Sequence, residues 1–135
     1  MAAWILKTEP TEYSFADLAK DGKTVWSGIS NAAALIHLRN ITKGDTLVIY
    51  HTGGERQAVG LARAASGPYP DPALGDPKRV VIDVAAGKPL AAPVTLAQFK
   101  ADSLLAKSDL VRIGRLSVVP LNAEQMARVL KLAGS

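Results

Sequence analysis

The sequence of 135 residues contains no cysteine. Disulfides and thiol chemistry are therefore excluded, and cysteine-based zinc sites are excluded with them. No apolar run reaches the roughly 18 to 20 residues that a membrane-spanning helix needs. The N-terminus also lacks the basic segment ahead of an apolar one that marks a secretory signal. These absences together predict a cytoplasmic protein.

The motifs of common enzyme classes are missing as well. The sequence has no glycine-rich phosphate loop, no dinucleotide-binding fingerprint and no Gly-x-Ser-x-Gly nucleophile elbow. His37 and His51 are not spaced as metal ligands. Glu9 and Glu12 flank Pro10 in what we expect to be a solvated turn. The sequence therefore predicts no catalytic residue, no metal and no cofactor.

Basic side chains are in modest excess. Lysine and arginine number 16 against 12 acidic residues, which gives a net charge of +4 and a pI of about 9.5. This excess permits an anionic partner such as nucleic acid, but a charge that only serves solubility explains it equally well. Hydrophobic residues make up 48% of the chain, enough for the core of one domain, which we place at residues 1–135.

Local patterns predict strands in the middle of the chain with helices scattered around them. The expected strands are residues 4–8, 46–51, 57–64, 79–84 and 116–119, and the expected helices are 14–19, 31–39, one after Thr95 and one after Asn122. Residues 66–78 hold four of the eight prolines and should form a loop. Short connections between the central strands exclude crossover helices, so the sheet should be mainly antiparallel. We therefore predict an α+β fold, a small mixed β-barrel, closed or nearly closed, with peripheral helices.

Trp26 is the first candidate for a binding site. It stands between turn residues, just ahead of a glycine and of the expected helix cap Asn31. Stacking of a nucleobase on its ring would contribute about 1 to 3 kcal/mol. Free backbone N–H groups at the start of the helix would favour an anion or an electron-rich acceptor. A core anchor without any ligand is an equally good interpretation of Trp26.

Other polar candidates lie near the expected ends of strands. Tyr50 and His51 end a central strand, where the mouth of a barrel would lie. His51 could bind a ligand there or make one structural hydrogen bond. Lys7 follows apolar residues in the first strand and needs an exit toward a polar mouth or an acidic partner. Ser14 is most simply a helix cap, which is compatible with a place beside the same mouth.

A local basic cluster, Lys107, Arg112 and Arg115, lies near the C-terminus. These residues could contact phosphates, which would provide affinity with little reading of sequence. Solvation of the surface explains any single one of them more simply.

Six segments, taken in order, resemble the EVE domain family. They are Trp4–Leu18, Val25–Asn31, Gly44-Asp45 with Tyr50-His51, Val59–Ala62, Tyr69–Pro72 and Leu110–Val118. Each motif is short, but their order and spacing match over about residues 4 to 132, which is nearly the whole chain.

The resemblance implies a PUA-like β-barrel with surrounding helices, related in fold to the YTH domains that read methylated adenine in RNA. It implies a non-enzymatic module that binds DNA or RNA and holds a modified base, such as a modified cytosine, in an aromatic pocket. The residues that the resemblance assigns to the base are Trp26, Asn31, Lys7, Ser14, Tyr50, His51 and Tyr69, with Arg112 and Arg115 nearby for phosphates.

The chain departs from the family pattern beside the expected pocket. Ser30 stands where the family usually has arginine, and residues 32–36 read Ala-Ala-Ala-Leu-Ile in place of Tyr-Gln-Ala-Arg-Asn. The pocket should therefore be more open and more apolar, which favours an alternative, a protein that binds a small molecule or nucleoside in the same pocket. A hydrolase or nuclease is disfavoured because an acidic cluster and metal ligands are missing, and a purely structural role stays open.

Overall fold

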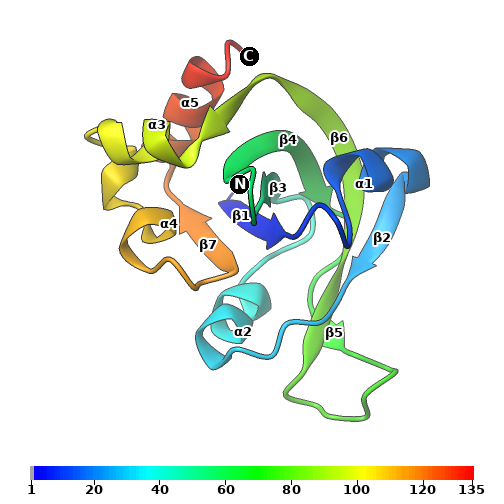
Figure 1. Cartoon of the computed structure of the whole chain (residues 1–135). Coiled ribbons are helices and arrows are strands. Elements are labelled where there is room, and N and C mark those ends of the chain that lie inside the picture. The colour runs from blue at the N-terminus through cyan, green and yellow to red at the C-terminus, as the bar shows by residue number, and fades with distance from the viewer. Residues whose placement is uncertain (1) are drawn as a thin grey trace.

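A computed structural model describes residues 2–135, and its strands form a strongly curved sheet (Figure 1). The strands are β1 (Ala3–Thr8), β2 (Lys23–Trp26), β3 (Thr46–His51), β4 (Gln57–Ala64), β5 (Tyr69–Pro70), β6 (Val80–Thr95) and β7 (Val118–Leu121). Their order across the sheet is β2-β6-β4-β3-β1-β7, and the short β5 pairs with β6 off this path. Among the described residues no helix has the length and apolar character needed to cross a membrane.

Pairing in the sheet is antiparallel except in one place. β1 lies parallel to β3, with Ala3 opposite Thr46 and Thr8 opposite His51. The edge strands β2 and β7 do not pair with each other within residues 2–135, so the barrel is open. The prediction of an α+β fold with a mainly antiparallel, PUA-like barrel is confirmed, with looser closure than a true barrel has.

Within residues 2–135, six helical segments surround the sheet, with α3 to α5 on one side of the view in Figure 1 and α1 on the other. They are α1 (Phe15–Asp21), α2 (Ala32–Arg39), α3 (Leu96–Ala101), the 3-10 turn η1 (Leu105–Lys107), α4 (Asp109–Arg112) and α5 (Ala123–Leu132). Ser14, Asn31, Thr95 and Asn122 each accept a backbone N–H at a helix start, as predicted. Such a cap stabilises a helix by about 1 kcal/mol.

Two strands differ from the prediction. β6 does not end at Val84 but continues to Thr95, although Pro89 and Pro93 interrupt the pattern of a strand. Beyond residue 86 only β4 pairs with it, so this half of β6 is a sheet edge, where proline is tolerated. Residues 23–26, to which the sequence analysis assigned no strand, form the edge strand β2 along β6.

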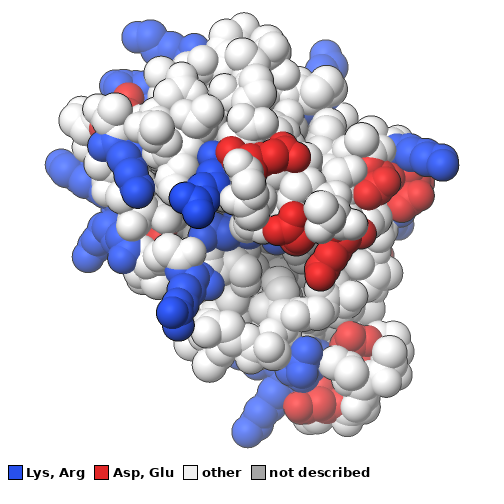
Figure 2. All heavy atoms as spheres, viewed as in Figure 1, with Lys and Arg blue, Asp and Glu red and all other residues white. Residues whose placement is uncertain are grey.

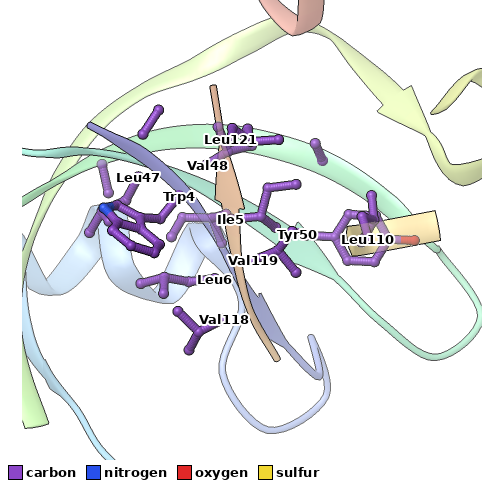
Figure 3. Packing of buried hydrophobic residues seen from close by; sticks show 14 of the residues in the cluster. Trp4, Ile5, Leu6, Leu47, Val48, Tyr50, Leu110, Val118, Val119 and Leu121 are labelled. Carbon is purple, nitrogen blue, oxygen red and sulfur yellow. The ribbon is translucent and has the colours of Figure 1, made fainter. Parts of the chain in front are cut away.

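The core lies where β1, β3 and β7 pack side chains together (Figure 3). Ile5, Leu6 and Val119 are fully buried there. Trp4 is also buried, and its Nε1 donates to Asp45 Oδ2 at 3.0 Å. On another part of the sheet, the side chain of Phe15 of α1 lies on the bare backbone of Gly60. These contacts hold β1 and α1 in place on the sheet.

Candidate functional site

A pocket of about 520 Å³ opens between the end of β1, the turn that follows it, and the segment that joins β2 to α2. Its wall consists of residues 7–9, Glu12, Tyr13, residues 24–31 and Ser117. This volume falls in the range of pockets that hold small organic groups, a nucleobase among them. We call it the Trp26 pocket.

Two aromatic side chains build one wall of the Trp26 pocket. Trp26 ends β2 opposite Ile82, and only 8% of its surface is exposed. The ring of Tyr13 meets the Trp26 ring edge to face, with centroids 6.3 Å apart and an angle of 81° between the planes. Burial and a 2.8 Å hydrogen bond to Asp21 raise the pKa of the Tyr13 hydroxyl. Trp26 is therefore both a core residue and a pocket wall, so the two interpretations from sequence are not exclusive.

The segment between β2 and α2 is held in shape by the backbone and by one arginine. Gly28 has a φ of 83°, which glycine adopts without strain. Arg79 Nε donates to the carbonyl oxygen of Ile29 at 2.9 Å. Asn31 Oδ1 accepts the N–H of Ala34 at 3.1 Å, so the amide nitrogen of Asn31 is the end left for a ligand. The pocket thus receives a polar donor from a residue that the helix cap already fixes.

Lys7 stands between the Trp26 pocket and a smaller hollow. Its Nζ donates to the carbonyl oxygen of Gly114 at 2.9 Å and lies 5.9 Å from the centre of the Tyr50 ring. Burial lowers the pKa of Lys7. The smaller space, which we call the second hollow, measures about 260 Å³ and is lined by Lys7, Tyr50, Thr52, Gly53, Arg56, Leu96, Leu110 and Gly114.

Glu9 and Glu12 line the Trp26 pocket, although we expected only a solvated turn there. Oxygens of the Glu9 carboxylate lie 3.3 Å from the Thr11 hydroxyl and 3.4 Å from that of Thr52. Together with Tyr13 they are the charged and aromatic lining residues that the sequence analysis did not assign to a site. The one available signal was their position directly after Lys7 and Thr8, at the end of the first strand.

Two other predicted residues support α1. Ser14 Oγ accepts the N–H of Asp17, in the capping geometry expected of it. His51 Nε2 accepts the N–H of Phe15 at 2.9 Å, and His51 Nδ1 lies 2.9 Å from Glu55 Oε1. The accepting Nε2 leaves the ring proton on Nδ1, where it bonds the glutamate. Neither Ser14 nor His51 lines the Trp26 pocket.

The remaining predicted residues lie outside the pocket wall. The Tyr69 hydroxyl donates to Asp83 Oδ1 at 2.6 Å, which raises the pKa of Tyr69 to about 12. Arg112 and Arg115 are exposed, and Arg115 follows Gly114, the residue that accepts from Lys7. The structure thus brings Lys7, Trp26 and Asn31 into one pocket and Tyr50 into the second hollow, and it does not bring the other five there.

Charge is unevenly spread over the face shown in Figure 2. Acidic side chains gather from the middle toward the side of α1 and β2, and basic side chains gather on the side of α3 and α4. An anionic chain that crosses this face would be attracted on the α4 side and repelled on the α1 side.

Comparison with known proteins gives one family and several similar structures. The family model of the EVE domain matches residues 2–132. A comparison with curated proteins finds no match. A solved structure of a protein from Rhodopseudomonas palustris is 37% identical, with a TM-score of 0.94 over 99% of this chain and 94% of that one.

Two further solved structures are similar over their whole length. A protein from Agrobacterium tumefaciens is 31% identical, with a TM-score of 0.94 over 99% of this chain and 94% of that one. The human THYN1 protein, in complex with DNA that contains 5-methylcytosine, is 25% identical, with a TM-score of 0.91 over 100% of this chain and 99% of that one.

Proposed function

Because this chain belongs to the EVE domain family, we propose that it is a non-enzymatic module that binds nucleic acid and holds one modified base in the Trp26 pocket. The observation that carries the proposal is the pocket itself, where an aromatic wall of Trp26 and Tyr13 faces polar groups in a space of about 520 Å³. The similar human THYN1 protein in complex with DNA containing 5-methylcytosine supports it.

The base would enter the pocket from outside a duplex or from a single strand. Extrusion of a base costs roughly a few kcal/mol, and least at an unpaired site. Full base–aromatic stacking contributes about 1 to 3 kcal/mol per base. Because only 8% of the Trp26 surface is exposed, contact with its ring would supply a part of this.

Polar groups around the pocket would read the edge of the base. The Asn31 amide nitrogen is available as a donor from a residue that the helix cap fixes, and Lys7 lines the same pocket. The hydroxyls of Ser27, Ser30 and Ser117 make no hydrogen bond to a carboxylate or a histidine within residues 2–135. These hydroxyls remain available to a polar edge of the base.

A second candidate function is binding of a free nucleoside or similar small molecule. Glu9 and Glu12 on the pocket wall favour it, because two carboxylates repel the phosphates of a polymer. This alternative requires tight binding of a nucleoside alone, with little dependence on salt.

The first test exchanges the base-reading amide without disturbing the helix cap. Asn31→Asp keeps an oxygen for the N–H of Ala34 but removes the amide donor, and aspartate caps a helix as well as asparagine does. We expect it to weaken binding of the preferred oligonucleotide by about tenfold, which is the size of one hydrogen bond. Asn122→Asp is the matched control, because Asn122 caps α5 in the same way and lies outside the pocket wall.

The measurement is fluorescence anisotropy of labelled oligonucleotides that carry cytosine, methylated cytosine, hydroxymethylated cytosine, adenine or methylated adenine. Selective binding of one modified base that Asn31→Asp loses and Asn122→Asp keeps supports base reading. Equal binding of all oligonucleotides by all three proteins would contradict it and would leave only a basic surface. Tight binding of a free nucleoside without any oligonucleotide binding would favour the second candidate.

A further inference from the structure

The second hollow differs from the Trp26 pocket in its charge. It is lined by two basic side chains, Lys7 and Arg56, and by no acidic residue. The Trp26 pocket shares Lys7 but carries Glu9 and Glu12. The two spaces share one lysine but therefore differ in the ligand they favour. The Trp26 pocket suits a neutral ring, and the second hollow suits an anion.

Glu9 and Gly53 form part of the border between the two spaces. A Cβ at Gly53 would lie 2.5 Å from Glu9 Oε2, so the carboxylate packs directly on the glycine backbone. Glu9 lines only the Trp26 pocket, and Gly53 lines only the second hollow. Glu9 thus places negative charge on the Trp26 pocket side of this border, and no acidic residue lines the side of the second hollow.

Tyr50 offers the second hollow an unused hydroxyl. Only 3% of the Tyr50 surface is exposed, and its Oη has no hydrogen-bond partner within residues 2–135. In that range, every fully buried side-chain oxygen or nitrogen has a hydrogen-bond partner. Because the Tyr50 hydroxyl has none, it is not fully buried and reaches open space. Figure 3 shows its oxygen directed toward Leu110, which also lines the second hollow. A buried tyrosine that aims a free donor into a cationic space is suited to an anion.

Arg56 is held in a costly backbone conformation beside this hydroxyl. Its φ of 50° is the one positive value at a residue other than glycine within residues 2–135. Glycine would take this conformation without strain, so the arginine side chain is kept at an energetic cost. Arg56 Nε donates to the carbonyl oxygen of Gly53 at 3.2 Å, which leaves its terminal N–H groups for another partner. None of the ion pairs in the described range includes Arg56 or Lys7.

We propose that the second hollow binds a backbone phosphate adjacent to the base in the Trp26 pocket, with Lys7, Tyr50 and Arg56 as its donors. The proposal rests on the proposed function, because it assigns the phosphate to the same nucleic-acid chain. Each group supplies what a phosphate oxygen accepts: an ammonium, a hydroxyl and the N–H groups of a guanidinium. The phosphate would fix the position of the chain, and the base would supply the specificity.

The test compares Arg56→Gln with Arg63→Gln, which removes the same charge from the other end of β4, outside both spaces. With the preferred oligonucleotide, the slope of log K against log salt should become shallower by about 0.7 to 0.9 in Arg56→Gln. The slope should not change in Arg63→Gln. Arg56→Gly, which suits the positive φ, should make the slope shallower by the same amount as Arg56→Gln, with no fall in Tm. The change in slope would then not come from unfolding. Tyr50→Phe should weaken binding several-fold with the slope unchanged.

Two results would overturn the phosphate site, and they can be told apart by whether the wild type binds the oligonucleotide. If the wild type binds the oligonucleotide and the slopes of Arg56→Gln and Arg63→Gln are the same, the second hollow holds no phosphate while base reading stands. If the wild type binds no oligonucleotide at any salt concentration, the proposed function fails and the phosphate site fails with it.

Discussion

The buried carboxylate of Asp45 holds two strand starts together through three hydrogen bonds. It accepts from Trp4 Nε1 and from both the N–H and the hydroxyl of Thr42, so it joins the start of β1 to the start of β3. Burial acts to raise the pKa of Asp45, but these hydrogen bonds outweigh it and hold that pKa below its usual value. The charged form is therefore favoured in the folded state.

Asp45→Asn should lower the free energy of unfolding at pH 7 by about 1 to 3 kcal/mol, because the amide cannot accept all three hydrogen bonds. A lowered pKa stabilises the wild type above the unfolded pKa, and this stabilisation is lost as the pH falls below about 4. Urea denaturation at pH 7 and pH 3 measures both effects. The difference between wild type and variant should narrow at pH 3, and a difference that stays the same would refute this account of Asp45.

Single residues of the site were predictable to different degrees. Trp26 and Asn31 stand out because a tryptophan and a helix cap in one short segment are a local signal. Glu9 and Tyr13 have only their position after the first strand as a signal, since their place on the wall depends on where the turn after β1 meets β2. Tyr50 was assigned to the mouth from its strand end, but the direction of its ring depends on the curvature of the sheet.

At the scale of elements, the seat of α1 on the sheet depends on Gly60. A Cβ there would lie 2.3 Å from Cε1 of Phe15, which is 8% exposed and anchors the helix. Gly60→Ala should therefore destabilise the protein by about 1 to 3 kcal/mol through overpacking. Thermal unfolding measures this, with Gly67→Ala as control because nothing lies within 4 Å of its added methyl group.

A matching loss of stability in Gly67→Ala would mean that the closeness of Phe15 is not the cause. Phe15→Leu combined with Gly60→Ala should recover part of the stability, because the smaller side chain makes room for the methyl group. Full additivity of the two changes would count against direct contact between them.

Helix starts were predicted better than strand ends, for a physical reason. Capping at Thr95 and Asn122 is settled by residues three positions apart, so it can be read from the local sequence. The second half of β6 forms because β4 lies beside it, and Pro89 and Pro93 conceal it from any local pattern. The same holds for β2, whose four residues become a strand only by pairing with β6.

At the scale of the whole molecule, the order of family motifs predicted the EVE domain and its mainly antiparallel barrel correctly. The parallel pairing of β1 with β3 was not predicted, because the two strands lie on either side of α1, β2 and α2. The prediction of a closed or nearly closed barrel left the place of the seam between β2 and β7 open, since closure depends on the curvature of the complete sheet.

The uneven charge of the molecule predicts how the basic side chains near α4 contribute to oligonucleotide binding. We expect Arg112→Gln combined with Arg115→Gln to weaken binding of modified and unmodified oligonucleotides by the same factor, because phosphates carry no sequence information. Lys88→Gln combined with Lys131→Gln is the control of equal charge, since both lysines are exposed and line neither space.

Anisotropy titrations of both double variants at one low salt concentration give the comparison. A loss confined to the modified oligonucleotide would assign Arg112 and Arg115 to base reading instead. An equal loss of affinity in the double lysine variant would mean that Arg112 and Arg115 contribute only through the net charge of the protein.

The position of β1 between β3 and β7 has a consequence for folding during synthesis. Its partners in the sheet lie about forty residues away on one side and more than one hundred on the other. Such distant pairing slows folding, because the entropy of closing large loops is lost before the contacts form. During synthesis, the apolar first strand emerges from the ribosome long before residues 118–121 can cover its free edge. A nascent chain of this kind is exposed to wrong pairing until almost the whole domain has been translated.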